Sequence, residues 1–536
     1  MDRRSFLLAG AAGAAALLGV GAAYRKLQEI PSTIHAPGRA EGHFLRDGKD
    51  LPAPSYEVNT DVAIFGSGAA GLMAAWKLHR EGHRRFMVFD GPQPYGNAAG
   101  GRHGDLAFPT GAHYLPLPSA ESFHVRELLH DLGILTGNPA AERPHVDERF
   151  LLHAPQERLL LDGRWHDGLL PREGVPQWER EEHDRFARIV EHARTARGSD
   201  GRRAFVFPMT ASSIDPQWRA LDQLTFRQWV ERERFRSPTL HWYLDYCSRD
   251  DYGAGYDKVS AWAGLHYFCS RGGEAESTGA TEWLTWPGGL DPLASLMDRS
   301  AGHRRRAGTV ASLGPSGRGV EAHCFEFVSG EVRSFVVKAR RAICAMPLFA
   351  AARVLDLREY GFDTQWHMPA YAPWMVSNFL MKRFPRELPD LPLSWDNVIY
   401  QGKGLGYVVS THQDIRVAPP EKTVFTAYMA LSRQTPEAAR KWLATATPEE
   451  LLEQASADLK VAYGDAFALS AERVDITLRP HAMASPLPGF LSNQGLRSLR
   501  DIDGPILFAH ADLSGFSVFE EAAWWGYQAA RKILSA

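Results

Sequence analysis

The sequence predicts an α/β fold in which a parallel-sheet domain is split along the chain and an α+β region is inserted into it. Three observations predict this fold class. Residues 62–65 and 86–89 are short apolar runs, and the first ends in glycines, as buried parallel strands do. Residues 69–79 between them have helical spacing. Residues 506–508 and 518–534 repeat the order of strand and helix at the end of the chain.

The turn after the first strand carries the pattern G-x-G-x-x-G. It consists of Gly66, Ser67, Gly68, Ala69, Ala70 and Gly71, and Asp90 and Gly91 follow the second strand about 20 residues later. In a strand–helix–strand unit such glycines allow a tight turn, a close approach of pyrophosphate and close packing of helix on strand, while the acid bonds the ribose. The context predicts a Rossmann-type dinucleotide-binding domain. No second copy of the pattern precedes a helix, which favours FAD over a nicotinamide dinucleotide.

The remaining elements divide the chain further. Residues 1–30 form a signal or anchor, and residues 31–55, which have no clear period, form a surface linker. We expect the FAD-binding domain in residues 56–120, 285–365 and 495–536, and the substrate domain in residues 121–284 and 366–494. Residues 120–280 are mostly helical, residues 304–345 form a β-meander, and residues 448–463 form one amphipathic helix.

The N-terminus has the pattern of a targeting segment. Arg3 and Arg4 precede a weakly apolar stretch that ends near Ala23 and is followed by Arg25 and Lys26. This arrangement resembles a twin-arginine signal, which predicts export to the periplasm by the twin-arginine translocation machinery. A general secretory signal and an uncleaved segment that holds the protein at the membrane are the alternatives.

The composition excludes several classes of function. The net charge of −3 and the absence of a basic stripe exclude a nucleic-acid partner. The four cysteines have no CxxC spacing, and no HExxH pattern occurs, so we expect no metal site. We interpret the cysteines as small buried side chains.

Several separated segments together resemble the flavin-containing amine oxidase superfamily. Besides the glycine pattern these are Gly100-Gly101-Arg102, Thr110 to Tyr114, Trp286 to Leu290 with Gly308 to Val310, Ala342 to Pro347, and residues 506–534. The resemblance implies that Gly100, Gly101 and Arg102 lie beside the pyrophosphate and that Gly111, Ala112 and His113 run along the flavin. It also implies that the backbone of Val310 holds adenine.

The last segment has a physical rationale as well. The resemblance implies that a helix starting near Val518 directs its free N–H groups at the flavin, where its dipole would favour the negative charge of reduced flavin. Asp512 is expected to bond the ribityl or pyrophosphate part, and Glu520 corresponds to the acid near the helix start.

The chain also departs from the superfamily. The stretch 481–489 has no cysteine where members with covalent flavin carry one, so we expect non-covalent FAD. Asn378 occupies the place of the lysine that many members hold near flavin N5. We therefore take His113 and Asn378 as candidate catalytic residues; structural packing and hydrogen bonding are the alternatives.

An aromatic-rich stretch, residues 241–286, contains Asp250, Asp251 and Tyr252. These three are candidates to bind the ammonium of a small-molecule substrate, although most of the aromatic residues are expected to be core. The leading hypothesis is an FAD-dependent oxidoreductase that oxidises a C–N bond of an amine or polyamine. The alternatives are a desaturase- or isomerase-like flavoenzyme acting on an apolar substrate, and a non-catalytic flavin-binding exported protein.

Overall fold

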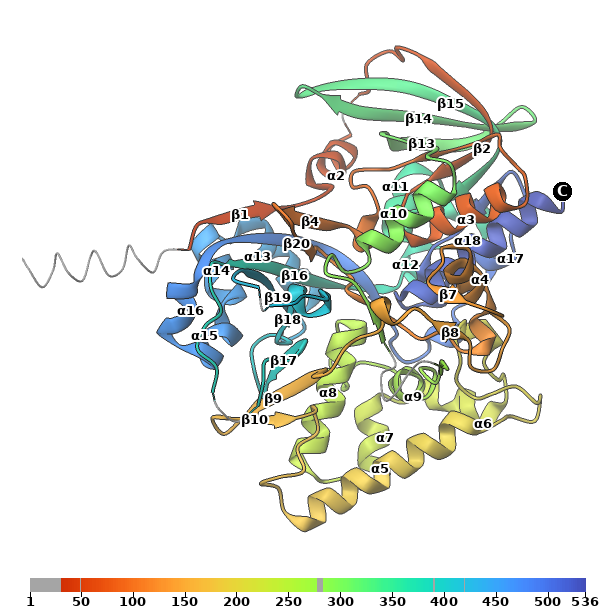
Figure 1. Ribbon diagram of the computed structural model, residues 1–536. Helices are drawn as coiled ribbons and strands as arrows, with labels where there is room; N and C mark the ends of the chain where they lie inside the picture. The colour runs from red at the N-terminus through yellow and green to blue at the C-terminus, as the bar shows by residue number, and fades with distance from the viewer. Residues whose placement is uncertain (1–29, 49, 277–282, 389–390, 419) are drawn as a thin grey trace, which may run out of the picture.

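The computed structural model describes residues 30–48, 50–276, 283–388, 391–418 and 420–536. Two large sheets form its two halves (Figure 1), with one at the upper right of the view and the other at the left. The predicted signal or anchor, residues 1–30, lies almost entirely outside the described residues and stays a prediction. None of the described helices is both long and apolar enough to span a membrane.

The first sheet is the predicted parallel sheet. Its strands are β2 (Glu57–Phe65), β3 (Phe86–Phe89), β12 (Arg305–Arg306), β13 (Thr309–Ser316), β14 (Gly319–Val328), β15 (Glu331–Cys344) and β21 (Ile506–Phe508). β2 pairs in parallel with β3 and β15, and β15 pairs in parallel with β21. The register aligns Phe65 with Phe89 and Cys344, and Cys344 with Phe508. Four strands therefore end at one edge, where open α/β sheets bind their ligands.

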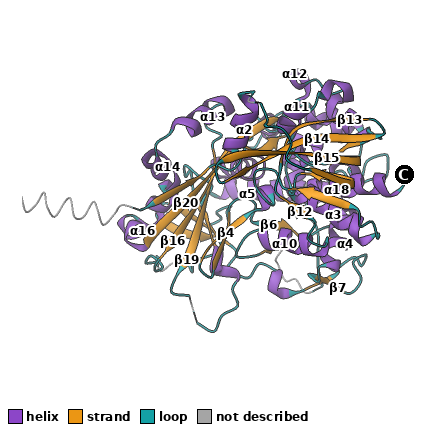
Figure 2. Ribbon diagram, turned by 90° about the horizontal axis from the view of Figure 1, so that it is seen from above, coloured by secondary structure: helices purple, strands orange, loops and turns teal. Residues whose placement is uncertain are grey.

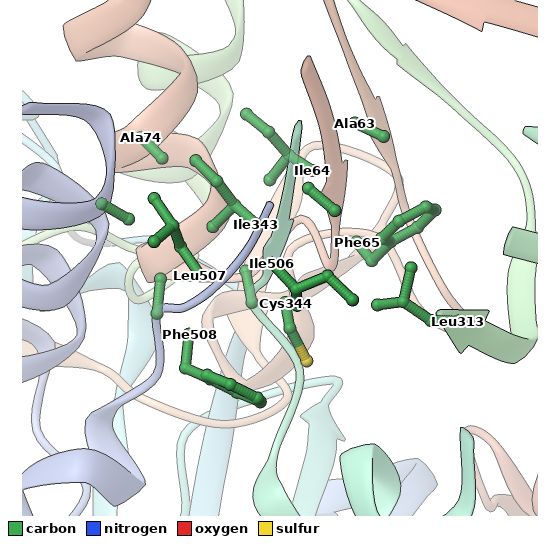
Figure 3. Packing of buried hydrophobic residues seen from close by; sticks show 14 of the residues in the cluster. Ala63, Ile64, Phe65, Ala74, Leu313, Ile343, Cys344, Ile506, Leu507 and Phe508 are labelled. Carbon is green, nitrogen blue, oxygen red and sulfur yellow. The ribbon is translucent and has the colours of Figure 1, made fainter. Parts of the chain in front are cut away.

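Helices cover this sheet and complete its core. They include α3 (Ala69–Arg80), α10 (Asp291–Ser300), α11 (Leu348–Val354), α17 (Gln494–Asp501) and α18 (Phe519–Leu534). Figure 3 shows Ile64, Ile343 and Leu507 of three adjacent strands packing together beside Ala74 of α3. α18 lies close against α3 at Gly526, where a Cβ would come within 2.1 Å of the carbonyl oxygen of Ala70. A glycine is therefore needed for the last helix to join the first.

The predicted β-meander is present. β13, β14 and β15 pair antiparallel in chain order, and the carboxyl half of β15 continues into the parallel part of the sheet. The long strand β15 thus belongs to both the meander and the dinucleotide-binding unit. This arrangement confirms the Rossmann-type fold that the sequence predicted.

The second sheet collects strands that are far apart in the chain. In spatial order these are β1 (Ser32–His35), β20 (Ala471–Ser485), β16 (Ala370–Met381), β19 (Thr423–Ala430), β18 (Tyr407–Val409), β17 (Asp396–Ile399), β9 (Glu157–Leu161) and β10 (Arg164–Asp167). Four helices pack on its outer face (Figure 2): α13 (Pro436–Thr445), α14 (Pro448–Ala455), α15 (Ala457–Tyr463) and α16 (Asp465–Ser470). The two inserted segments therefore share one sheet.

Two local predictions were wrong. Residues 31–55 are not a plain linker, because they contain β1 and α2 (Arg39–Arg46). β1 is only four residues long, too short for a visible period, and it forms by pairing with β20 some 440 residues away. The predicted helix 448–463 is two helices, α14 and α15, which meet at Ser456.

The prediction that residues 120–280 are mostly helical holds for residues 177–269 but is wrong for residues 132–176, which contain four strands and no α-helix. α5 (Gln177–Thr195), α6 (Pro216–Arg219), α7 (Phe226–Arg232), α8 (Pro238–Tyr252) and α9 (Ala261–Cys269) lie together at the bottom of Figure 1. The remaining elements are β4 (Gly100–His103), β5 (Leu106–Pro109), β6 (Tyr114–Pro116), α4 (Phe123–Asp131), β7 (Leu135–Thr136), β8 (His145–Val146), β11 (Trp283–Thr285) and α12 (Thr364–His367).

Candidate functional site

The glycine turn has the geometry of a dinucleotide cradle. Gly66 has a φ of +114°, which L side chains rarely adopt, and a Cβ on Gly71 would lie 1.8 Å from the Gly66 carbonyl oxygen. Gly68 begins α3, and no described side chain caps this end of the helix. The first N–H groups of α3 and the positive end of its dipole are therefore free to meet an anion.

Asp90 stands at the carboxyl end of β3 as predicted. Its Oδ1 is buried and has no hydrogen-bond partner within the described chain, although Arg305 Nε lies 3.5 Å away. Burial raises the pKa of Asp90, while a hydrogen bond to Ser67 and the charge of Arg305 oppose the rise. Gly91 donates its N–H to Gly308 O at 3.0 Å. This contact brings the strand that carries Val310 beside the acid.

The structure brings a segment other than the predicted Gly100-Gly101-Arg102 to the glycine turn. Gly96 lies against the glycine turn, where its Cβ would be 3.6 Å from the Cα of Gly68. Gly100, Gly101 and Arg102 instead belong to the β4–β5 hairpin. Arg102 is exposed and donates to the carbonyl oxygens of Gly104 and Asp105. The geometry favours the residues around Gly96, rather than Arg102, as the neighbours of a pyrophosphate.

A buried arginine holds the segment of residues 110–114. Arg479 of β20 donates to Thr110 O at 2.8 Å and to Asn97 Oδ1 at 2.9 Å. Gly111 accepts a hydrogen bond from the Tyr428 hydroxyl, and a Cβ on Gly111 would lie 2.2 Å from Asn97 O. Ala112 keeps an exposed side chain although its backbone is bonded on both sides. Ala112 therefore stays accessible from outside the described chain.

His113 packs against aromatic rings. Its ring stacks on Tyr428 at 4.4 Å between centroids and lies 5.3 Å from the ring of Trp395. Burial lowers the pKa of His113 to about 3, so the imidazole is neutral near pH 7. The neighbouring Tyr114 lies 4.9 Å from Trp283.

Like α3, α18 begins without a side-chain cap. Val518 is the N-cap, and no described side chain caps it. The side chain of Asp512 is fully buried, and its Oδ2 accepts hydrogen bonds from Leu348 N–H and the Tyr371 hydroxyl. Burial acts to raise the pKa of Asp512, but His510 and these hydrogen bonds lower it below its usual range. Its Oδ1 has no hydrogen-bond partner among the described residues, and the cofactor contact of Asp512 stays a prediction.

Three carboxylates lie close to one another near the ring of Tyr428. Asp250 comes from α8, and Asp396 and Glu157 are direct neighbours on β17 and β9. Burial and the charge of Asp251 raise the pKa of Asp250 to about 7. Burial, and then the charges of Asp250 and Glu157, raise the pKa of Asp396 well above its usual range.

These carboxylates can be reached by a ligand. Asp250 and Asp396 keep part of their side-chain surface accessible, and Glu157 keeps more. None of the three forms an ion pair with a described basic side chain at up to 4.0 Å. A cation bound between them would favour their ionised forms and so oppose the rise in their pKa values, which burial chiefly causes.

The other two predicted substrate residues have different surroundings. Asp251 is buried and forms an ion pair with Arg271. Tyr252 is 1% exposed and donates its hydroxyl proton to Ala263 O at 2.9 Å. Asp250 alone of the three remains accessible to a substrate.

Asn378 lies inside the second sheet. Its side chain has no exposed surface, and its Oδ1 accepts the Thr426 hydroxyl at 2.8 Å. A fully covered amide cannot touch a substrate in this conformation, so the geometry does not support a catalytic role for Asn378.

Sequence reasoning missed Asp396, Glu157, Arg271 and Arg479. No motif marks them, because strand pairing across more than 200 residues brings the first two together. The one signal visible in the sequence is an arginine within a strand, as at Arg479, because a buried arginine almost always has a partner.

Among the described residues, no group of three or more His, Cys, Asp or Glu side chains could hold a metal ion. Cys247, Cys269, Cys324 and Cys344 are all free and buried, as interpreted from the sequence.

The fold and the site define a Rossmann-type dinucleotide-binding protein with a second large sheet. Uncapped N-termini at α3 and α18, the unpaired oxygen of Asp90 and the glycine cradle all suit a flavin nucleotide. The family model of flavin-containing amine oxidoreductases matches residues 69–534. The chain belongs to this family, and it is therefore a flavin-dependent oxidoreductase.

Solved structures with the same fold include amine oxidases. A double mutant of putrescine oxidase has a TM-score of 0.63 and 15% identity, covering 90% of this chain and 100% of that chain. Cyclohexylamine oxidase from Brevibacterium oxydans has a TM-score of 0.60 and 18% identity, covering 89% and 99%. A fatty acid isomerase from P. acnes has a TM-score of 0.57 and 15% identity, covering 88% and 98%. No curated protein sequence matches significantly.

Proposed function

We propose that this protein binds FAD non-covalently and oxidises a C–N bond of an amine or polyamine. The observation that carries the proposal is the unpaired carboxylate cluster of Asp250, Asp396 and Glu157 beside the aromatic rings of His113 and Tyr428. Carboxylates and aromatic faces are the groups that recognise an ammonium. The absence of a cysteine from residues 481–489 supports non-covalent binding.

The residues present suit each part of this reaction. Flavin, when bound, supplies the two-electron acceptor for the C–H bond beside the nitrogen. Asp250, with a pKa of about 7, can pair with the ammonium and take its proton. His113 stays neutral, because burial lowers its pKa to about 3, and so does not repel the cation.

A polyamine would use the cluster more fully than a monoamine. Asp396 and Glu157 lie on adjacent strands and do not interact with described cations, whereas Asp250 is on a helix that packs nearby. Once a bound cation favours their ionised forms, Asp250 and the pair of Asp396 and Glu157 can hold two ammonium groups. We therefore favour a diamine or polyamine as substrate.

A second candidate is an isomerase-like or desaturase-like reaction on an apolar acid. Arg271 is buried near Tyr114, and its Nε has no hydrogen-bond partner among the described residues. A substrate carboxylate could compete for it. Asp251 already pairs with this arginine, which favours the amine. A non-catalytic flavin-binding role is the third alternative.

The test is an anaerobic visible spectrum of the purified protein with monoamines, diamines and unsaturated fatty acids. Bleaching of the flavin bands by a diamine supports the proposal. Bands that persist with every amine, together with turnover of a fatty acid, would support the second candidate. Stable flavin bands with no turnover of any kind would support the non-catalytic role.

The location of the protein is also a proposal. The twin-arginine pattern of Arg3 and Arg4 supports export of the folded protein, with its flavin, to the periplasm by the twin-arginine machinery. An uncleaved N-terminal segment would keep the protein associated with the membrane.

A further inference from the structure

Arg479 of β20 is a buried cation without a counter-charge. Its side chain is only 8% exposed, and burial lowers its pKa to about 10. Among the described residues, the only ionisable group that acts on this pKa is the Tyr428 hydroxyl, which is neutral because burial holds its own pKa well above the usual value. A buried charge without an opposite charge is costly. The arginine therefore points to an anion that lies outside the described chain.

Other buried arginines differ from Arg479 in this respect. Burial lowers the pKa of three further described arginines, and a nearby carboxylate opposes the fall in each case. These pairs are Arg126 with Glu121, Arg219 with Asp222, and Arg500 with Glu521. Arg479 is the one member of this group whose pKa no described carboxylate affects.

The guanidinium of Arg479 lies beside the segment that covers the glycine turn. Its Nη1 donates to Gln93 Oε1 at 3.1 Å and to Asn97 Oδ1 at 2.9 Å. Between these two residues, Tyr95 donates its N–H to Ser67 Oγ of the glycine turn at 3.2 Å. The guanidinium and the glycine turn thus contact the same short segment, residues 93–97.

The other arginines near this turn are engaged elsewhere. Arg305 lies 3.5 Å from Asp90 and 3.4 Å from Asp298, so two carboxylates offset its charge. Arg102, which the resemblance placed at the pyrophosphate, is exposed and donates to carbonyl oxygens of its own hairpin. The N-terminus of α3 contributes only about half an elementary charge, whereas a pyrophosphate carries a negative charge on each phosphate.

We propose that Arg479 is the counter-cation of the FAD pyrophosphate, supplied by the second sheet instead of by the turn that follows Asp90. This role rests on the proposed non-covalent FAD. The isoalloxazine of oxidised FAD is neutral, so the pyrophosphate is the anionic part of the cofactor. Four of the five N–H donors of Arg479 bond to neutral oxygens of Gln93, Asn97 and Thr110. One N–H of Nη2 is left for a phosphate oxygen.

The test measures how tightly ADP and adenosine displace FAD from the full-length holoprotein, followed by the fluorescence of the released flavin. ADP carries two phosphates and adenosine carries none, so the ratio of the two affinities isolates the contribution of the charged group. Arg479→Gln removes the positive charge, and Arg479→Lys keeps it. The matched control is Arg126→Gln, because Arg126 is 3% exposed and also bonds to neutral oxygens, those of backbone carbonyls.

Arg479→Gln should lower the ratio of ADP affinity to adenosine affinity about 10- to 100-fold, the loss expected for a hydrogen bond between charged groups. Arg479→Lys should keep most of the ratio, and Arg126→Gln all of it. A purely structural role predicts that both variants at position 479 weaken ADP and adenosine alike, and that result would overturn the proposal. A fall in the ratio for Arg102→Gln, with no fall for Arg479→Gln, would also overturn it.

Asn97→Asp tests the same charge while leaving the arginine in place, and it decides the question if Arg479→Gln does not fold. The new carboxylate would pair with the buried guanidinium. It should therefore lower the ratio and raise the midpoint of thermal unfolding of the protein stripped of flavin. A lower midpoint would show that Arg479 needs no counter-charge and would overturn the proposal. Purification with FMN, or without flavin, would refute the proposed FAD itself, whereas bound FAD with an unchanged ratio in Arg479→Gln refutes only the role of Arg479.

Discussion

The role of Asp250 in binding the ammonium of the substrate can be tested by combining a substitution with a change of pH. Its pKa lies at about 7 instead of 3.8, chiefly because of burial. At pH 8 about 90% of the groups are then ionised, and at pH 6 about 10%. Asp250→Asn removes the charge at every pH, whereas lowering the pH removes it only from the wild type.

The size of the effect follows from the interaction that is lost. A hydrogen bond between charged groups contributes about 1.5–3 kcal/mol, which is about 10- to 150-fold in kcat/KM. We expect the wild type to exceed Asp250→Asn by this factor at pH 8. The ratio of the two should fall about five- to ninefold between pH 8 and pH 6, since protonated Asp250 resembles asparagine.

The assay is steady-state oxidation of the amine that bleaches the flavin fastest, across pH 6 to 8. Taking the ratio of the two enzymes cancels the ionisation of the amine itself. Asp245→Asn is the matched control, because Asp245 lies on the same helix and already pairs with Arg249. Its ratio to wild type should not change with pH. A ratio for Asp250→Asn that stays constant from pH 6 to 8 would refute the reasoning.

Three further predictions concern the cofactor and stability. Gly71→Ala should abolish flavin binding, measured as the ratio of flavin to protein absorbance, because its Cβ would overlap Gly66 O; Gly42→Ala, with nothing within 4 Å, should keep the flavin. Arg479→Leu should lower the free energy of unfolding by about 2–4 kcal/mol in denaturant and reduce flavin content, because it frees the segment of residues 110–114. Burial raises the pKa of Glu521 from 4.5 to about 7. The contribution of its protonated form to the free energy of unfolding is therefore complete below pH 4.5 and is lost as the pH rises through 7. Glu521→Gln should therefore gain about 3 kcal/mol relative to wild type between pH 4.5 and pH 8, and an equal difference at both pH values would contradict this.

The sequence by itself determined the dinucleotide-binding half. The turn from Gly66 to Gly71 and the strand before Asp90 depend on neighbours within about 30 residues, so their spacing is visible in the chain. The closing helix near Val518 was predictable for the same reason, since a 16-residue helix shows its own period.

Only the tertiary structure decided the substrate side. Asp396 meets Glu157 because β17 pairs with β9, and Arg479 reaches Thr110 across the two sheets. Asn378 looked like a site residue in the chain, yet the folded protein leaves it no exposed surface. Such contacts join residues hundreds of positions apart, and a residue's accessibility depends on what packs over it, so neither leaves a local pattern in the sequence.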